Sequence, residues 1–170
     1  MGKADIFKTE LGTLFKNVKK INEGKLWIKA INKDTKEFII YLIQYEQLYT
    51  SKNPSSNKGI DEDGNVIGYY SELSEKYNEK KEHNTPFTLF DTGEFFDSFV
   101  VNVYSDHFLI DANDKKERTI EVDGERLTII TELFEKYGEG IIGLTDSSKL
   151  QLQELLKDKY ILNIRQLLNV

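Results

Sequence analysis

The first residues that could bind a metal form an acidic cluster of Asp61, Asp63 and Asn65. Oxygen ligands at alternate positions are typical of the start of an EF-hand calcium loop. That loop also needs Gly at its sixth position and Glu at its twelfth, where this chain has Val66 and Glu72. Because the Gly of the sharp turn is missing, we interpret the cluster as a solvated turn and expect no metal site.

Few other side chains are suited to metal binding or nucleophilic catalysis. The chain has no Cys, which excludes disulfides, thiolate zinc sites and Cys nucleophiles. It has two His, His83 and His107, and it lacks the G-x-S-x-G, H-E-x-x-H and P-loop patterns. We interpret both His as surface or turn residues, and we expect no catalytic residue of this kind and no cofactor.

The segment Leu89-Phe90-Asp91-Thr92-Gly93 resembles the active-site loop of retroviral-type aspartic proteases. In such dimers each subunit supplies one Asp, and the paired carboxylates share a proton. Gly140-Ile141-Ile142-Gly143 resembles the apolar element that closes that fold. However, Glu94 stands where a small residue is usual, only Gly124 is available for a flap, and the residues before Asp91 read as helix or loop. The dimeric protease is therefore the alternative hypothesis.

The same tripeptide is part of a longer pattern. In order, this pattern contains Gly59-Ile60-Asp61, Asp63-Gly64-Asn65, Tyr70-Ser71, Lys76, Lys80 and Leu89-x-Asp91-Thr92-Gly93-x-Phe95-x-x-Ser98. Over residues 59–112 it resembles the tail-completion, or virion-morphogenesis, proteins of tailed bacteriophages, with Phe95 in place of the usual Leu. Residues 137–145 resemble the end of such proteins more weakly.

The resemblance implies a non-enzymatic virion protein of a phage or prophage, located at the neck or head–tail junction. Its partners would be further copies in a homo-oligomeric ring and neighbouring head or tail proteins. It would be made in the bacterial cytoplasm and end in the virion, without membrane or sequence-specific nucleic-acid contacts, although a ring can surround DNA. The motif residues would be structural, namely Gly59, Asp61, Gly64, Leu89, Asp91, Thr92, Gly93, Phe95 and Ser98.

The tripeptide also has a local interpretation that does not need the resemblance. Phe95, Phe96 and Phe99 can bury a short helix that starts at Glu94. Asp91 or Thr92 can then cap the first turn of that helix. We therefore predict that Asp91 caps a helix and is not an acid catalyst.

The remaining pattern predicts an α+β fold in one domain over residues 1–170, with an N-terminal helical part at 1–50. A small antiparallel sheet, with a hairpin around 99–112, packs against the N-terminal and C-terminal helices. Apolar spacing, alternation and turn residues predict helices at 5–21, 26–50, 71–83, 128–137 and 146–168, and strands at 99–104, 108–112, 119–122 and 126–130.

Composition and charge restrict the function further. The net charge of −6 and the pI near 5.1 argue against a broad nucleic-acid-binding face. No apolar run approaches the roughly 20 residues that span a bilayer. The polar segments 51–65 and 113–118 hold almost no large apolar side chain, so we expect both to be mobile loops.

The two long helices carry more apolar surface than one small domain can cover. The helix predicted at 26–50 has apolar residues on two flanks, and the C-terminal stripe is widened. Exposed apolar area beyond a few hundred Å² usually marks an interface. We expect at least one candidate interface residue to be exposed in the monomer and buried between subunits; the candidates are Ile40, Ile43, Ile161 and Leu162.

Overall fold

The computed structural model describes residues 17–18, 23–78, 81–122 and 125–168, and the predicted helix at 5–21 lies outside them apart from Asn17 and Val18. In chain order the elements are α2 (Glu23–Ala30), α3 (Lys33–Tyr41), η2 (Leu42–Leu48), η3 (Pro54–Ser56), α4 (Glu72–Tyr77), α5 (Glu94–Asp97), β1 (Val100–Val103), β2 (Phe108–Asp111), β3 (Lys115–Val122), β4 (Glu125–Glu132), α6 (Leu133–Tyr137), η4 (Glu139–Ile142) and α7 (Asp146–Leu168).

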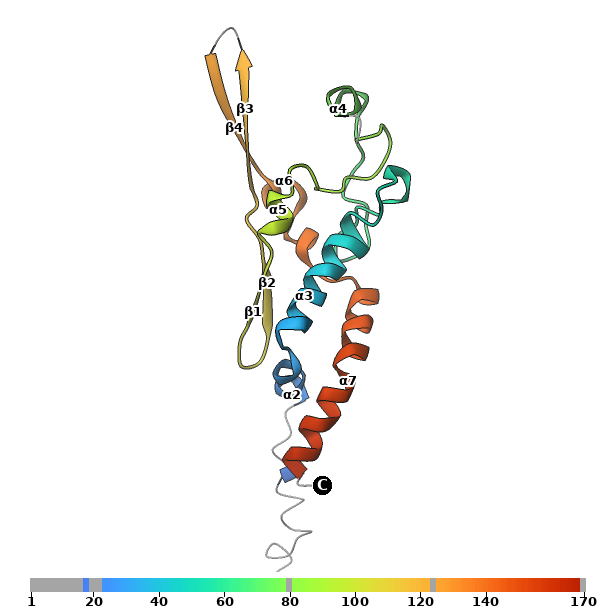
Figure 1. Cartoon of the computed structure of the whole chain (residues 1–170), viewed down its shortest axis with the longest axis vertical. Coiled ribbons are helices and arrows are strands. Elements are labelled where there is room, and N and C mark those ends of the chain that lie inside the picture. The colour runs from blue at the N-terminus through green and yellow to red at the C-terminus, as the bar shows by residue number, and fades with distance from the viewer. Residues whose placement is uncertain (1–16, 19–22, 79–80, 123–124, 169–170) are drawn as a thin grey trace, which may run out of the picture.

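The predicted α+β class is confirmed, with two separate antiparallel hairpins, β1–β2 and β3–β4. Helix α3 packs between β1 on one side and α7 on the other, while α2 packs along α7 (Figure 1). The β3–β4 hairpin projects from the opposite end of the molecule to α2 (Figure 1). None of the helices in the described ranges is long and apolar enough to cross a membrane.

The predicted single helix at 26–50 is wrong, because the helix is interrupted after Ala30 and a new helix starts at Lys33. The Asn32 side chain accepts hydrogen bonds from the backbone N–H and the hydroxyl of Thr35, at 3.0 and 2.8 Å. This is an N-cap, and it starts α3 as a new helix. Apolar spacing alone did not reveal the break, since apolar residues continue on both sides of it.

Helix α3 continues directly into the π-helix η2, which carries two buried glutamines. The Gln44 amide donates to the carbonyl of Phe96 at 2.6 Å, which joins η2 to α5. Gln47 donates to the carbonyl of Gly143 at 2.9 Å and accepts from the backbone N–H of Thr145 and the hydroxyl of Ser148, at 3.0 and 2.8 Å. The two amides therefore position the short helix before β1 and the first turn of α7.

The apolar core surrounds these amides. It joins helices α3, η2 and α7 to α5, β1 and η4, and its main members are Ile39, Leu42, Ile43, Leu48, Phe96, Phe99, Val101, Ile141, Leu152 and Leu156. Ile43 has no exposed surface, so its prediction as an interface residue is corrected: it belongs to the core of its own chain.

One of the two predicted loops, at 113–118, differs from the expectation. Residues 115–118 of the segment 113–118 form the first half of β3, whose Lys115 pairs with Glu132 of β4. The segment 51–65 is held near its middle, where Gly59 donates to the carbonyl of Leu48 and Ile60 to that of Gln47. The mobility of this segment stays a prediction.

The other predicted elements are confirmed with shifted bounds. The hairpin of β1 and β2 and the whole of α7 lie where the sequence places them. The helix predicted at 71–83 is the shorter α4, which the Ser71 side chain caps. The helix predicted at 128–137 begins only at Leu133, because the preceding residues continue strand β4.

The buried amide of Gln47 supplies the first testable prediction. The exchange Gln47→Ala should lower the free energy of unfolding by about 2–4 kcal/mol, because it leaves a cavity and removes a hydrogen-bond partner from three buried or partly buried polar groups. Urea unfolding at neutral pH measures this change. The exchange Gln151→Ala, at an exposed position of α7, should stay within about 0.5 kcal/mol of the wild type. Equal losses for the two variants would contradict the assigned role of Gln47.

Candidate functional site

The acidic cluster forms a tight turn in which the Asp61 side chain binds backbone N–H groups of the turn. The Asp61 carboxylate accepts hydrogen bonds from the N–H groups of Asp63 and Asn65, at 3.0 and 2.8 Å. Gly64 adopts the left-handed φ of 82° that this turn requires. In the part of the chain that the structure describes, no three His, Asp or Glu residues are grouped as metal ligands. Asp61 therefore acts on the turn itself.

Gly59 joins this turn to the second half of the motif. Its φ is 52°, and a Cβ atom there would lie 2.2 Å from the carbonyl oxygen of Phe87. A Cβ atom at Gly68 would lie 2.6 Å from the ring of Phe87, and the Gly68 carbonyl accepts the Phe87 N–H at 2.8 Å. The chain that leads to Leu89 and Asp91 therefore packs directly on the residues that flank the turn.

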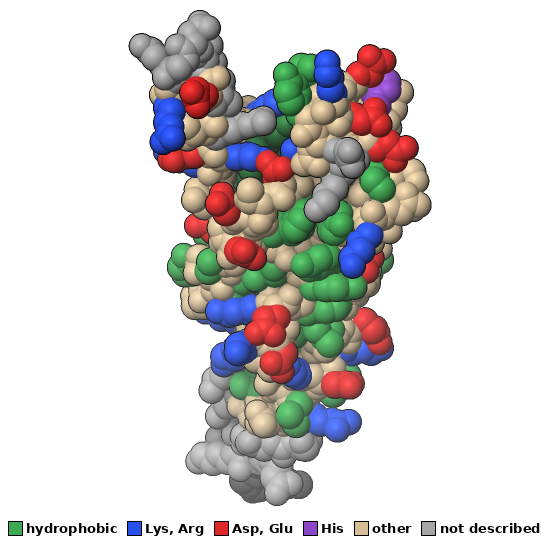
Figure 2. Space-filling view, turned by 45° about the horizontal axis from the view of Figure 1, so that its top comes forward, with side chains coloured by type: hydrophobic (Ala, Val, Ile, Leu, Met, Phe, Trp, Pro, Cys, Tyr) green, Lys and Arg blue, Asp and Glu red, His purple; other side chains and the backbone are tan. Residues whose placement is uncertain are grey.

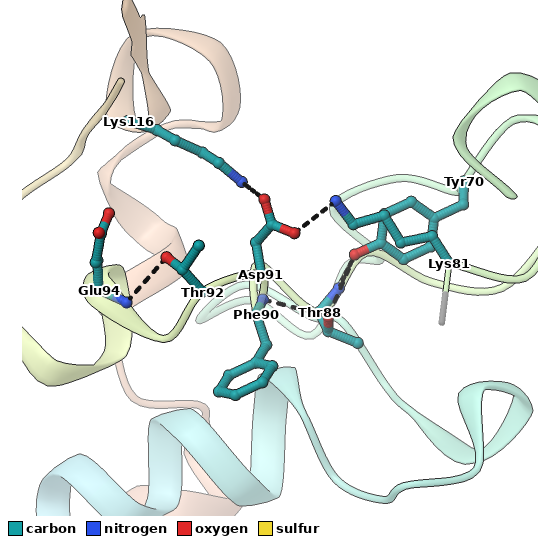
Figure 3. Close-up of polar contacts among 8 residues, drawn as sticks. All are labelled: Tyr70, Lys81, Thr88, Phe90, Asp91, Thr92, Glu94 and Lys116. Atoms are coloured by element: carbon teal, nitrogen blue, oxygen red, sulfur yellow. Dashed lines mark hydrogen bonds and ion pairs between the residues drawn. The ribbon is translucent and has the colours of Figure 1, made fainter. Parts of the chain in front are cut away.

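Asp91 lies between two lysines from different elements (Figure 3). Its carboxylate accepts from Lys81 at 3.0 Å, in the segment after α4, and from Lys116 of β3. The carboxylate is about one-third exposed. Asp91 thus connects the α4 segment to the projecting hairpin.

The prediction that Asp91 caps a helix is wrong. The N-cap of α5 is Gly93, with a left-handed φ of 97°, and the nearest side-chain contact is a long one of 3.5 Å from the N–H of Glu94 to the Thr92 hydroxyl. Asp91 points instead toward the lysines (Figure 3). The physical reason is that two cations within reach bind the carboxylate more strongly than one exposed backbone N–H.

The remaining motif residues support the path from α5 to the hairpins. The Ser98 hydroxyl donates to the carbonyl of Phe95 at 2.7 Å and accepts the N–H of Asn113 at 2.8 Å. Leu89 and Phe95 are half-buried against the core, and Leu89 has a positive φ of 55°. Ser98 therefore links α5 to the connection between the two hairpins.

The two lysines decide the charge state of Asp91. Partial burial alone would raise the pKa of its carboxyl, but the hydrogen bonds and charges of Lys116 and Lys81 outweigh that effect and lower the pKa below its usual value. Asp91 is therefore ionised at neutral pH. In a pair of carboxyls that share a proton, one of the two must have a raised pKa, and the lysines beside Asp91 act against that.

A cleft of about 380 Å³ opens above this ion pair, between the base of the hairpin and α4. Its lining includes the apolar side chains of Phe95, Ile129 and Tyr137. Figure 2 shows the hollow between two prongs of the surface, with Lys, Asp and Glu side chains near its floor. We call it the basic cleft, because its charged lining residues are Lys81, Lys115, Lys116, Lys136, Asp91 and Glu94.

The candidate interface residues differ in exposure. Ile161 and Leu162 of α7 are 39% and 53% exposed, whereas Ile40 is half-buried and packs against the core. Leu155 lies seven residues before Leu162, on the same face of α7, and is also exposed. The outer surface of α7 therefore carries apolar side chains that the described part of the chain leaves exposed.

His83 and His107 are both exposed, and neither lines the basic cleft. His107 contacts the carboxylate of Asp106 at 2.8 Å and stacks on Tyr104, in the turn of the first hairpin. The sequence did not identify Lys81 and Lys116 as partners of Asp91. They lie ten and twenty-five residues away from it, and no periodic spacing relates the three.

No protein-family model, curated protein or solved structure matches this chain.

The two glycines of the turn supply a matched pair of variants. Gly59→Ala should lower the free energy of unfolding by roughly 2 kcal/mol or more. The added Cβ atom would clash with the Phe87 carbonyl, and the left-handed φ at this position is unfavourable for Ala. At Gly64 an added Cβ atom would have open space, so Gly64→Ala has only the unfavourable φ and should lower the free energy of unfolding by about 1 kcal/mol. Urea unfolding of both variants tests the order, and a larger loss for Gly64→Ala would contradict the close packing at Gly59.

The lowered pKa of Asp91 supplies a pH-dependent prediction. Because the folded pKa lies below the unfolded value near 3.8, the ion pairs stabilise the fold above that pH and lose this effect as pH falls through the folded pKa. Asp91→Asn should lower the free energy of unfolding by about 0.5–1 kcal/mol at neutral pH, and this difference should shrink in acid. Urea unfolding between about pH 7 and pH 3 measures it. Asp158→Asn, at an exposed position of α7, is the control.

Proposed function

We propose that this chain is a structural virion protein of a tailed phage or prophage, a tail-completion or head–tail connector subunit that acts in an oligomeric ring. The observation that carries the proposal is the packing of Gly59 on the carbonyl of Phe87, which joins the two halves of the motif into one unit. The motif residues stabilise turns, helix ends and ion pairs. Structural roles of this kind are what we expect of motif residues in a protein whose function is assembly.

The exposed surface also favours an assembling subunit. Leu155, Ile161 and Leu162 of α7 lie at the surface, as do Leu127 and Ile129 of the second hairpin. Apolar side chains grouped in this way mark contacts with other proteins. The net charge of −6 suits a ring through which DNA passes, because carboxylates do not retain phosphates.

The surroundings of Asp91 do not favour the protease alternative. Two lysines keep this carboxylate ionised, whereas a catalytic pair of aspartates must hold a proton between them. In addition, the helix α5 begins directly after Gly93, and Glu94 in its first turn adds a second negative charge. We therefore assign Asp91 a structural role in the proposed virion protein and no catalytic role.

The test is deletion of the gene from a lysogen that encodes this chain. Electron microscopy of the induced lysate should show heads and tails that are complete but not joined. Expression of the wild type and of Asp91→Asn in trans should both restore joined particles. Normal particles after deletion would overturn the proposal. Restoration by the wild type alone, with cleavage of a peptide substrate that Asp91→Asn lacks, would favour the protease.

The exposed face of α7 supplies a prediction about assembly. Ile161→Glu should leave the monomer folded and stop assembly of the ring, because a charge cannot be buried in an apolar contact without a partner. Circular dichroism checks the fold, and sedimentation checks the oligomer. Asn102→Glu, at an exposed polar position of β1, adds the same charge elsewhere and should leave assembly unchanged. If the Ile161→Glu variant assembles like the wild type, the exposed face of α7 is not part of the interface.

A further inference from the structure

The basic cleft has an excess of positive charge in an acidic protein. Four lysines and two carboxylates are among its lining residues, which leaves a surplus of two positive charges there, whereas the whole chain carries −6. Lys81 and Lys116 share the single carboxylate of Asp91. A cleft of this charge with apolar side chains on its walls is suited to an acidic segment of a protein.

The other two lysines are available to a partner. Lys115 is 61% exposed and contacts Glu132 only at 3.7 Å, which is a weak surface pair. Lys136 is exposed and lies over the ring of Tyr137, with its ammonium 5.0 Å from the ring centre. Both side chains can turn toward an incoming carboxylate at little cost.

The same chain presents a surface of opposite charge. The turn at 61–65 and the start of α7 border a second hollow of about 370 Å³. Its titratable lining consists of Glu46, Glu62, Asp63 and Asp146 against Lys58 and Lys149, which leaves a surplus of two negative charges. We call it the acidic surface. Asp63 is exposed at the tip of the turn, and the acidic surface shares no lining residue with the basic cleft.

We propose that the basic cleft of one copy binds the acidic surface of a second copy, with the turn around Asp63 entering between the hairpin and α4. Two distinct and complementary surfaces on one chain give a head-to-tail contact, which closes into a ring when the rotation allows it. The inference rests on the ring of the proposed function and assigns two charged surfaces that meet in it, in addition to the apolar face of α7. Opposite charges also direct the approach of the two copies, so association should weaken as salt is raised.

Two single variants test the contact. Asp63→Lys changes the acidic surface, and Lys136→Glu changes the basic cleft. Each variant alone should associate at least about tenfold more weakly than the wild type, because its own surfaces no longer have complementary charge. Sedimentation over a range of protein and salt concentrations measures the dissociation constants. Lys29→Glu, at an exposed position of α2, makes the same charge change as the cleft variant and should associate like the wild type.

A mixture of the two variants makes the test specific. The Lys136→Glu variant keeps a native acidic surface, and the Asp63→Lys variant keeps a native basic cleft. Each mixed pair therefore retains one native contact, and the mixture should form dimers with the affinity of the wild-type contact. This recovery is expected only for a head-to-tail contact between these two surfaces.

Several results would overturn the inference. The inference fails if the wild type does not associate, or if the single variants associate like the wild type. It also fails if the mixture associates no more tightly than each variant alone. Binding of duplex DNA by the wild type that is lost in Lys136→Glu would assign the basic cleft to DNA instead. The gene deletion described above judges the proposed function separately. Unjoined heads and tails together with unchanged association of Asp63→Lys would therefore reject this contact and leave the proposed function standing.

Discussion

The buried amide of Gln47 is the interaction on which the arrangement of the other elements depends. Through one side chain, the π-helix η2 holds the carbonyl of Gly143 and both the backbone and the side chain of the first turn of α7. One turn earlier, Gln44 holds the end of α5. A π-helix widens the backbone locally, and such segments are rare and often functional. Here it lets two polar side chains on one short segment point into two different parts of the core.

The candidate site is a consequence of that arrangement. Gln44 fixes α5, which begins three residues after Asp91, and the Asp91 carboxylate reaches β3 and the segment after α4. Gly59, eleven residues after Leu48 in η2, brings the turn against Phe87. The motif thus describes a continuous set of contacts from the central helix to the base of the projecting hairpin. The small and polar residues of the pattern therefore hold these elements together.

The sequence predicted the elements whose signals are local, such as the first hairpin and α7, because alternation and helical spacing repeat within each of them. It did not predict the break at Asn32, since the decisive contact is a cap with Thr35 and apolar spacing passes over it. It also interpreted the charged start of β3 as a loop. A two-stranded ribbon with water on both sides needs no apolar alternation, and cross-strand pairs such as Lys115 with Glu132 are sufficient there. The partners of Asp91 depend on the placement of three distant segments, which no local pattern encodes.

The projecting hairpin affects how readily the free protein aggregates. Among the described residues, β3 and β4 pair only with each other, so each keeps one edge whose backbone groups have no strand beside it. Leu127, Ile129 and Ile130 are exposed along the same ribbon. Open edges with apolar side chains promote uncontrolled strand addition and fibrillar aggregation, and the alternating charges of the ribbon oppose it. In the proposed virion protein, binding to a neighbouring subunit would remove free chains from solution and so limit this aggregation.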